Sequence, residues 1–213
     1  MLNGKKIALG VTGGIAVYKA VDLVSRLRKQ GAEVRVIMTE HAQQFVTPLT
    51  FKEISGNKVA VSMWDSNQEF NVEHISLANW ADAFVVAPAT ANILAKMANG
   101  IADDLLSTTL LAAQSPIIVC PAMNTGMYQN PITQENIAKL EAHGVTVMHP
   151  AVGYLACGVS GPGRLPEPQQ IVEFIDDFFA KKDGDMVGLK VLVTAAGTRE
   201  PIDPVRFVGN RSS

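Results

Sequence analysis

The sequence predicts an α/β fold with a doubly wound, mostly parallel sheet. Short apolar runs alternate with amphipathic helical segments through the first 180 residues, which is typical of such sheets. The glycine turn Thr12-Gly13-Gly14 joins the first apolar run to a helix, and two later runs end in proline and then asparagine, at residues 88–92 and 121–124. Proline cannot donate to a sheet ladder, so it marks where each of these strands stops.

The first part of the chain predicts a strand, a helix and a second strand. Residues 7–11 are apolar, apolar residues then recur at helical spacing from Ile15 to Leu27, and Gly31 is a stop signal. The apolar run at residues 34–38 predicts the second strand. The segments that follow are expected to be, in order, short helical pieces at residues 41–54, a small strand at 59–64 and a polar loop at 66–73.

The middle of the chain continues this alternation. Asp103 and Asp104 suit the N-terminus of a helix, and Asn130-Pro131 is typical of an N-cap followed by the first helical residue. The remaining strands are expected at residues 85–87, 117–120 and 145–148, and the remaining helices at 93–99, 105–113, 131–143 and 171–179.

A segment rich in glycine and proline, residues 151–168, interrupts the pattern before the last helix. A loop of this length in a compact domain is usually a lid or a binding loop. We expect one domain at residues 1–180, followed by a polar linker at 181–188. Residues 189–213 begin a new strand but are too few to bury a core, so we expect them to lack fixed structure.

The composition describes a globular protein and excludes several classes of partner. Of 213 residues, 47% are hydrophobic and 18% are charged, and the net charge is −2, so no basic field attracts nucleic acid or anionic lipid. No apolar run reaches the roughly 18 residues of a membrane span, and the N-terminus lacks the pattern of a signal peptide. Two cysteines are too few for a disulfide framework. We therefore expect a cytoplasmic protein, with Cys120 in the core and Cys157 in a glycine-rich segment.

The carboxyl ends of the expected strands predict the ligand site, because ligands of open α/β sheets bind there. The glycine turn supplies amides and a positive helix end, which suit a phosphate, although such turns also occur without a ligand. The dinucleotide pattern G-x-G-x-x-G is absent, and Thr39 stands where that pattern needs an acidic residue. We expect a mononucleotide-sized ligand near the neutral donors Thr39, Thr90, Asn92 and Ser107, although hydroxyls at 107–109 equally suit a helix surface.

Four motifs, over about residues 4–180, resemble the homo-oligomeric flavin-containing cysteine decarboxylase family. Residues 88–92, Pro-Ala-Thr-Ala-Asn, are similar to its Pro-Ala-Ser-Ala-Asn-Thr motif, and residues 121–128 to its P-x-M-N-x-x-M-W motif. The segment from His74 to Asp82 resembles its histidine segment. Ala156-Cys157-Gly158, with Gly-Pro-Gly-Arg at 161–164, resembles the cysteine-bearing flap of the phosphopantothenoylcysteine decarboxylase branch.

Three positions depart from these motifs. Thr90 replaces a common serine and keeps the hydroxyl, and Tyr128 replaces a common tryptophan and keeps an aromatic face. Ile93 replaces a common threonine and loses a hydroxyl, so the resemblance implies no flavin contact from this position.

The resemblance implies a Rossmann-like flavoprotein fold, FMN as the cofactor, and decarboxylation of 4′-phosphopantothenoylcysteine to 4′-phosphopantetheine in coenzyme A biosynthesis. In this family FMN oxidises the cysteine thiol, the oxidised product loses CO2, and the reduced flavin returns a hydride. His74 is then the base, since imidazole titrates near neutrality; Asn124 holds the substrate carboxylate or the adjacent amide, and Cys157 returns the proton. The implied FMN-facing residues are Gly13, Gly14, Thr39, Ala89, Thr90, Asn92, Ser107, Ala122 and Met123, of which Met123 equally suits the core.

Residues 189–213 resemble the start of phosphopantothenate–cysteine ligase, through the stretch from Thr194 to Arg206 and through Asn210. No nucleotide-binding loops follow, so we expect no ligase activity from this chain. The resemblance also implies a homotrimer whose sites are shared between chains, and a dodecamer for the longer bifunctional protein. No metal is implied.

Four other functions are weighed against this one. A peptide-cysteine decarboxylase of the lantibiotic type is disfavoured by Cys157, and a flavin prenyltransferase by the Met123-Asn124 pair. A non-catalytic FMN-binding regulator is disfavoured by His74. A plain nucleotide-binding module predicts that replacing His74 or Cys157 leaves ligand binding intact and abolishes no activity.

Overall fold

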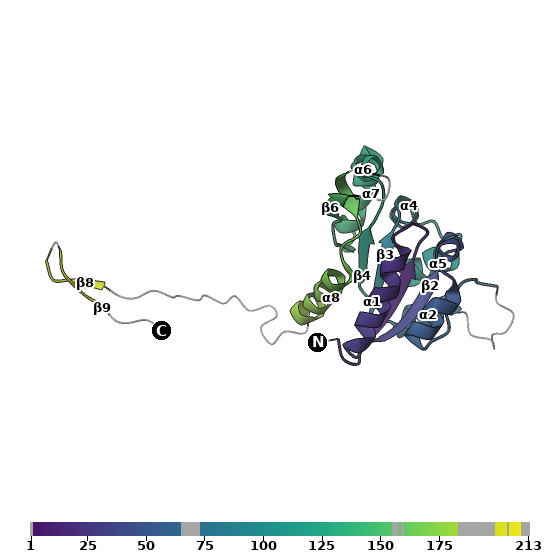
Figure 1. The fold of residues 1–213 in the computed structure, drawn as a ribbon, viewed down its shortest axis with the longest axis horizontal. Helices are drawn as coiled ribbons and strands as arrows, with labels where there is room; N and C mark the ends of the chain where they lie inside the picture. Colours follow the sequence, from purple (N-terminus) through teal and green to yellow (C-terminus); the bar gives the residue numbers. More distant parts are fainter. Residues whose placement is uncertain are drawn as a thin grey trace. The chain divides into compact units, whose positions relative to one another are not determined.

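The computed structural model describes residues 2–64, 73–154, 158, 160–182, 199–203 and 205–209. The chain divides into two compact units, Met1–Ala180 and Lys181–Ser213, and each is described by itself (Figure 1).

A five-stranded parallel sheet forms the centre of the first unit, in the order β2-β1-β3-β4-β5 (Figure 1). This architecture confirms the predicted doubly wound α/β fold. The strands are β1 (Lys6–Val11), β2 (Glu33–Met38), β3 (Ala83–Ala89), β4 (Ile117–Pro121) and β5 (Thr146–Val147).

Two apolar clusters lie on the two faces of this sheet. In β1, Ile7 and Leu9 belong to one cluster and Ala8 to the other, because successive side chains of a strand point to opposite faces. The first cluster is completed by helices α1 (Val17–Lys29), α2 (Pro48–Ser55) and α8 (Pro168–Lys182). The second is completed by helices α3 (Glu73–Trp80), α4 (Ala91–Asn99), α5 (Leu105–Ala112) and α7 (Pro131–Ala142).

Side-chain caps fix where the helices after β3 and β4 begin. Thr90 caps α4 by accepting a hydrogen bond from the Ile93 amide at 3.5 Å. Asn124 caps the short helix α6 (Thr125–Gln129), accepting from the Gly126 amide at 2.8 Å. Asn130 caps α7 and Pro131 is its first residue, as the sequence predicts.

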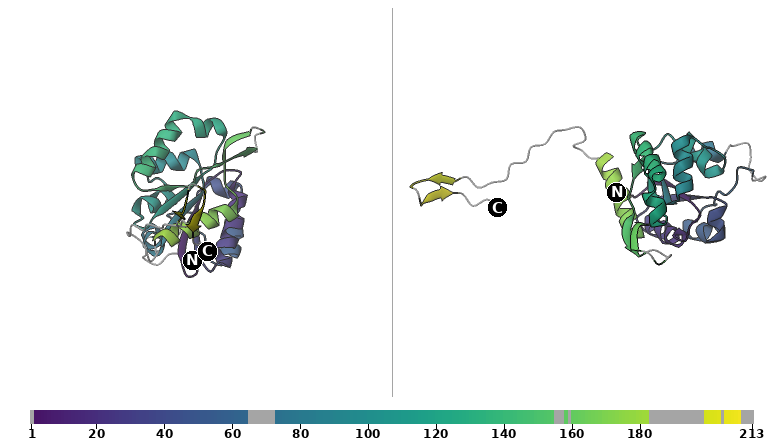
Figure 2. Two further views of the ribbon diagram at one scale, coloured as in Figure 1. Left: turned by 90° about the vertical axis from the view of Figure 1, so that its left-hand side faces the viewer. Right: turned by 90° about the horizontal axis from the view of Figure 1, so that it is seen from above.

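The segment expected to be a long loop, residues 151–168, contains a two-stranded antiparallel sheet, so that expectation is wrong. Strands β6 (Ala151–Tyr154) and β7 (Ser160–Arg164) pair from Ala151–Arg164 to Tyr154–Ser160 (Figure 2). Glycine and proline are uncommon in strands, so the sequence of β7 does not predict one. Its glycines allow close contacts with Thr125 and Met123. Gly163 has a φ of +127°, and its carbonyl accepts the Met123 amide at 3.0 Å.

Other boundaries also differ from expectation. Residues 59–64 form only an isolated bridge between Ile37 and Ala60 rather than a strand. Residues 66–72 of the expected loop and the expected strand at 189–195 lie outside the described residues. Helix α8 extends to Lys182, two residues into the expected linker. The described helices are all too short or too polar to cross a bilayer.

The second unit contains a small hairpin where we expect no fixed structure, so this expectation is wrong for the described residues. Strands β8 (Arg199–Pro201) and β9 (Phe207–Gly209) pair in antiparallel fashion. The Asp203 carboxylate accepts the backbone amides of Val205 at 2.9 Å and of Arg206 at 2.7 Å. This local turn chemistry closes the hairpin.

We predict that Gly163→Ala destabilises the protein more than Gly144→Ala does. Both glycines have positive φ, which costs an alanine about 1–2 kcal/mol. A Cβ at Gly163 would also lie 2.3 Å from the Met123 carbonyl oxygen, whereas one at Gly144 would meet nothing within 4 Å. Urea denaturation should give an additional loss of at least about 1 kcal/mol for Gly163→Ala. Equal losses would contradict the close contact between β7 and Met123.

Candidate functional site

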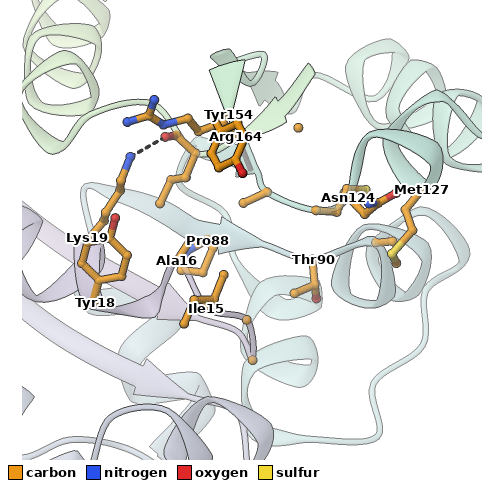
Figure 3. Close-up of a pocket in the computed structure, with 17 residues that line it drawn as sticks. Ile15, Ala16, Tyr18, Lys19, Pro88, Thr90, Asn124, Met127, Tyr154 and Arg164 are labelled. Atoms are coloured by element: carbon orange, nitrogen blue, oxygen red, sulfur yellow. Dashed lines mark hydrogen bonds between the residues drawn. The ribbon is translucent and has the colours of Figure 1, made fainter. Parts of the chain in front are cut away.

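A pocket of about 400 Å³ opens at the carboxyl edge of the sheet (Figure 3). The turn after β1 contributes Gly13 and Gly14 to its lining, and the segment after β3 contributes Thr90. Beyond β4, Ala122, Met123 and Asn124 line it. The structure thus brings together six of the residues predicted from the sequence, from three strands that are distant in the chain.

The other predicted FMN-facing residues, all within the described part of the chain, do not line this pocket. Ala89 is buried inside β3, and Asn92 is exposed in the first turn of α4. Thr39 accepts the Ala42 amide at 3.3 Å, at the start of the 3₁₀ helix η1 (His41–Gln44). Ser107 forms a capping box with Asp104 at the start of α5, which accounts for its hydroxyl without a ligand.

Of the two predicted proton-transfer residues, the structure describes only His74, which does not line the pocket. His74 is half-buried on α3, which packs against α5. Cys157 lies outside the described residues. The strands that flank Cys157 in the sequence reach the pocket, because Tyr154 of β6 and Arg164 of β7 are among its lining residues.

The buried hydroxyl of Thr12 joins the turns after β1 and β3. It donates to the Pro88 carbonyl oxygen at 2.7 Å and accepts the Thr90 amide at 3.1 Å. Thr12 does not line the pocket but positions two residues that do. Sequence reasoning missed it, although a threonine directly before a glycine pair at a strand end is a usable signal.

The two glycines of the turn have different reasons to be glycine. A Cβ at Gly13 would lie 2.5 Å from the His41 Cβ, so close packing requires this glycine. A Cβ at Gly14 would meet only Thr90 Cγ2, at 3.9 Å. Gly14 therefore leaves space in the pocket next to the start of α1.

The start of α1 and the pocket walls fit a phosphorylated, flat ring ligand. The N-cap of α1 is Ala16, so no side chain caps this helix, and its N-terminal end lies beside the pocket. The amides at a helix N-terminus and the helix dipole favour a phosphate. Ile15, Pro88 and Met123 supply apolar surface, which suits an aromatic ring system.

Two cations that the sequence analysis gave no role lie across the pocket from Asn124 and Met127 (Figure 3). Lys19 is 6% exposed, and its ammonium donates to the Leu165 carbonyl oxygen at 2.9 Å and to Glu167 Oε1 at 3.0 Å. Arg164 Nη2 donates to the same Glu167 oxygen at 2.6 Å. The hydrogen bond from Lys19 is the main cause that lowers the pKa of Glu167. A lysine on the buried stripe of α1 was the available signal in the sequence.

Cys120 is fully buried in β4, as predicted, and burial raises the pKa of its thiol to about 12. This thiol therefore stays protonated and belongs to the core rather than to the site. In the part of the chain that the structure describes, no three His, Cys, Asp or Glu side chains gather where they could hold a metal ion.

Comparison with protein families gives two matches. The flavoprotein family matches residues 1–180, and the C-terminal domain of DNA/pantothenate metabolism flavoproteins matches residues 186–213. Among curated proteins, the bifunctional coenzyme A biosynthesis protein CoaBC is 50% identical in Haemophilus influenzae and 49% identical in Bacillus subtilis. Both alignments cover 100% of this chain and 53% of the relative, so the chain spans about half the length of these curated relatives.

Solved structures share the fold of the first unit. A cysteine-to-serine mutant of PPC decarboxylase, in complex with pantothenoylaminoethenethiol, superposes with a TM-score of 0.74 and 32% identity, over 83% of this chain and 99% of that one. The FMN-dependent cysteine decarboxylase SpaF gives 0.72 and 32%, over 82% and 96%. The epidermin biosynthesis protein EpiD from Staphylococcus aureus gives 0.69 and 27%, over 80% and 99%.

We predict that Thr12→Val destabilises the protein by about 1–3 kcal/mol, because it leaves the Pro88 carbonyl and the Thr90 amide without their buried partner. Thr50→Val, at a half-buried position of α2, is the matched control and should change the stability by less than about 0.5 kcal/mol. Urea denaturation measures both. A loss for Thr12→Val no larger than the control's would mean that the hydroxyl does not hold the two turns together.

Proposed function

The chain belongs to the flavoprotein family, and we propose that residues 1–180 bind FMN and decarboxylate 4′-phosphopantothenoylcysteine to 4′-phosphopantetheine. The observation that carries this proposal is the pocket at the carboxyl edge, where Gly14, Thr90 and Asn124 meet from the ends of three strands. Related proteins named CoaBC and PPC decarboxylase support the substrate class.

The pocket has features that suit both the phosphate and the ring system of FMN. The N-terminal end of α1, which no side chain caps, suits its phosphate, and Thr90 adds a neutral hydroxyl. Met123 and Pro88 provide apolar surface for the ring. When bound, FMN supplies the two-electron oxidation of the substrate thiol and the return of those electrons after CO2 has left.

Asn124 is proposed to orient the cysteine end of the substrate. Its side-chain oxygen is held by the Gly126 amide at 2.8 Å, which fixes the carboxamide at the pocket wall. A neutral amide orients a carboxylate or an amide by hydrogen bonds. It adds no positive charge that would stabilise the carboxylate against leaving as CO2.

His74 and Cys157 are proposed to move the protons. His74 would take the thiol proton as the substrate is oxidised, and Cys157 would return a proton to the enethiolate. A thiol has a reference pKa of about 8.5, so at neutral pH it carries the proton that this step needs.

His74 does not line the pocket of its own chain, and this supports a shared site. We propose a homotrimer in which α3 of one copy approaches the pocket of the next. Apolar side chains surround the pocket mouth in the single chain: Ile15 is 62% exposed, Tyr18 60% and Met127 51%. Exposed apolar side chains gathered around one pocket support an interface there.

The C-terminal segment is proposed to belong to a second domain. We assign residues 189–213 to the start of a phosphopantothenate–cysteine ligase domain, in keeping with the family match at 186–213. We propose that residues 181–188 link the two domains, although residues 181 and 182 belong to α8.

The product mass tests the function. The FMN-loaded protein is incubated with 4′-phosphopantothenoylcysteine, and the expected product has lost CO2 alone. We predict that His74→Asn lowers turnover by about 10²–10⁴-fold, as expected for loss of a general base, while the flavin spectrum is retained. His143→Asn, at the exposed C-cap of α7, is the control and should keep full activity.

Cys157→Ser separates the two halves of the reaction. We predict a product that has lost CO2 and two hydrogens and a flavin left reduced, because oxidation and CO2 loss proceed but the proton needed for re-reduction is missing. A fully reduced product from Cys157→Ser would remove this residue from the mechanism. An unchanged substrate with flavin bound to the wild-type protein would indicate a binding protein without catalysis.

A further inference from the structure

The pocket has a neutral side and a cationic side. Asn124, Thr90 and Met127 lie on one side, and Lys19 and Arg164 lie on the other (Figure 3). Among the described lining residues these two are the charged side chains, and no carboxylate lines the pocket. The mechanism proposed above uses the neutral side and leaves the cationic side without a function.

The two cations share a single carboxylate oxygen. Lys19 Nζ lies 3.0 Å and Arg164 Nη2 2.6 Å from Glu167 Oε1. Two positive charges against one negative charge leave the cluster with a net charge of about +1. An anion in the pocket would therefore be attracted, and the Glu167 carboxylate lies behind the cations rather than in the lining.

Lys19 and Arg164 have different parts in this cluster. The Lys19 side chain is 7% exposed and its two described hydrogen bonds go to Leu165 and Glu167, so it fixes the carboxylate. The Arg164 side chain is 43% exposed and one of its guanidinium donors is used by Glu167. A guanidinium has five N–H donors in a rigid fork, and its planar shape matches phosphate oxygens. Glu167 thus orients the Arg164 guanidinium, whose other N–H groups can donate to a ligand.

We propose that Arg164, oriented by Glu167 and Lys19, binds the phosphate monoester of a ligand in this pocket. The inference rests on the proposed function for the identity of that ligand. Its two sources are the 4′-phosphate of the substrate and the phosphate of FMN, which share the same dianionic chemistry. The uncapped start of α1 already suits the flavin phosphate, so we expect Arg164 to hold the substrate phosphate. The carboxylate that leaves as CO2 then lies toward Asn124, away from both cations.

The first arm of the test compares 4′-phosphopantothenoylcysteine with pantothenoylcysteine, which lacks the phosphate. We expect Arg164→Gln to lower kcat/KM for the phosphorylated substrate about 10- to 100-fold, mainly through KM, as for loss of a charge-assisted hydrogen bond. The value for pantothenoylcysteine should be unchanged. Arg164→Lys should recover part of the loss, since it retains the charge without the fork. Arg26→Gln, which removes the exposed contacts of Arg26 with Asp22 and Gln169, is the matched control and should change kcat/KM for neither substrate.

The second arm compares the affinities of the apoprotein for FMN and riboflavin. A loss for Arg164→Gln that is confined to FMN would assign Arg164 to the flavin phosphate, which also supports the phosphate site. Equal losses for phosphorylated and dephosphorylated ligands in both arms, or no loss in either, would overturn it. If the wild-type protein prefers neither 4′-phosphopantothenoylcysteine over pantothenoylcysteine nor FMN over riboflavin, the proposed phosphate site is wrong, and no variant is needed to show it. If the wild-type protein turns over neither substrate, the proposed function fails while the flavin arm still tests Arg164.

Discussion

The geometry of the pocket depends on one buried hydroxyl, that of Thr12. Parallel strands end at a common edge, but their turns diverge unless something joins them. Thr12 joins the turn after β1 to the segment after β3 by donating to Pro88 and accepting from Thr90. Gly14 and Thr90, which line the pocket from the two turns, are thereby kept in one arrangement. A backbone hydrogen bond from the Met123 amide to the Gly163 carbonyl then joins the segment after β4 to the β6–β7 hairpin.

The fold was predictable because its signals are local. Apolar runs, helical spacing and the caps at Asn130 and Asp104 each act over a few residues. The hairpin β6–β7 was missed because its strands lack the alternation of a half-buried strand. Its Gly161 and Gly163 are required by close contacts with Thr125 of α6 and with Met123, which are distant in the sequence. The hairpin at β8–β9 was missed because its turn depends on the side chain of Asp203, a contact that a strand pattern does not reveal.

The lining of the pocket was predictable where a residue lies within three positions of the end of a strand. Gly14, Thr90 and Asn124 lie at such positions, and strand order alone brings them together. Ser107 was assigned to the ligand, but its hydroxyl completes a helix cap, and both functions use the same residue type at the same kind of position. Lys19 and Arg164 were not assigned any function, because their proximity depends on how α8 and β7 pack beside α1. Side-chain type alone does not reveal such a contact.

The contact between Lys19 and Glu167 joins residues that are 148 positions apart in the chain. During synthesis from the N-terminus, the strands β1, β3 and β4 are complete long before Glu167 is made. The contact between Lys19 and Glu167 can form only after the chain has been made up to α8, and contacts of high sequence separation form slowly. The cationic side of the pocket is therefore the last part to assemble. A nascent chain that has not yet reached α8 carries the neutral half of the site alone.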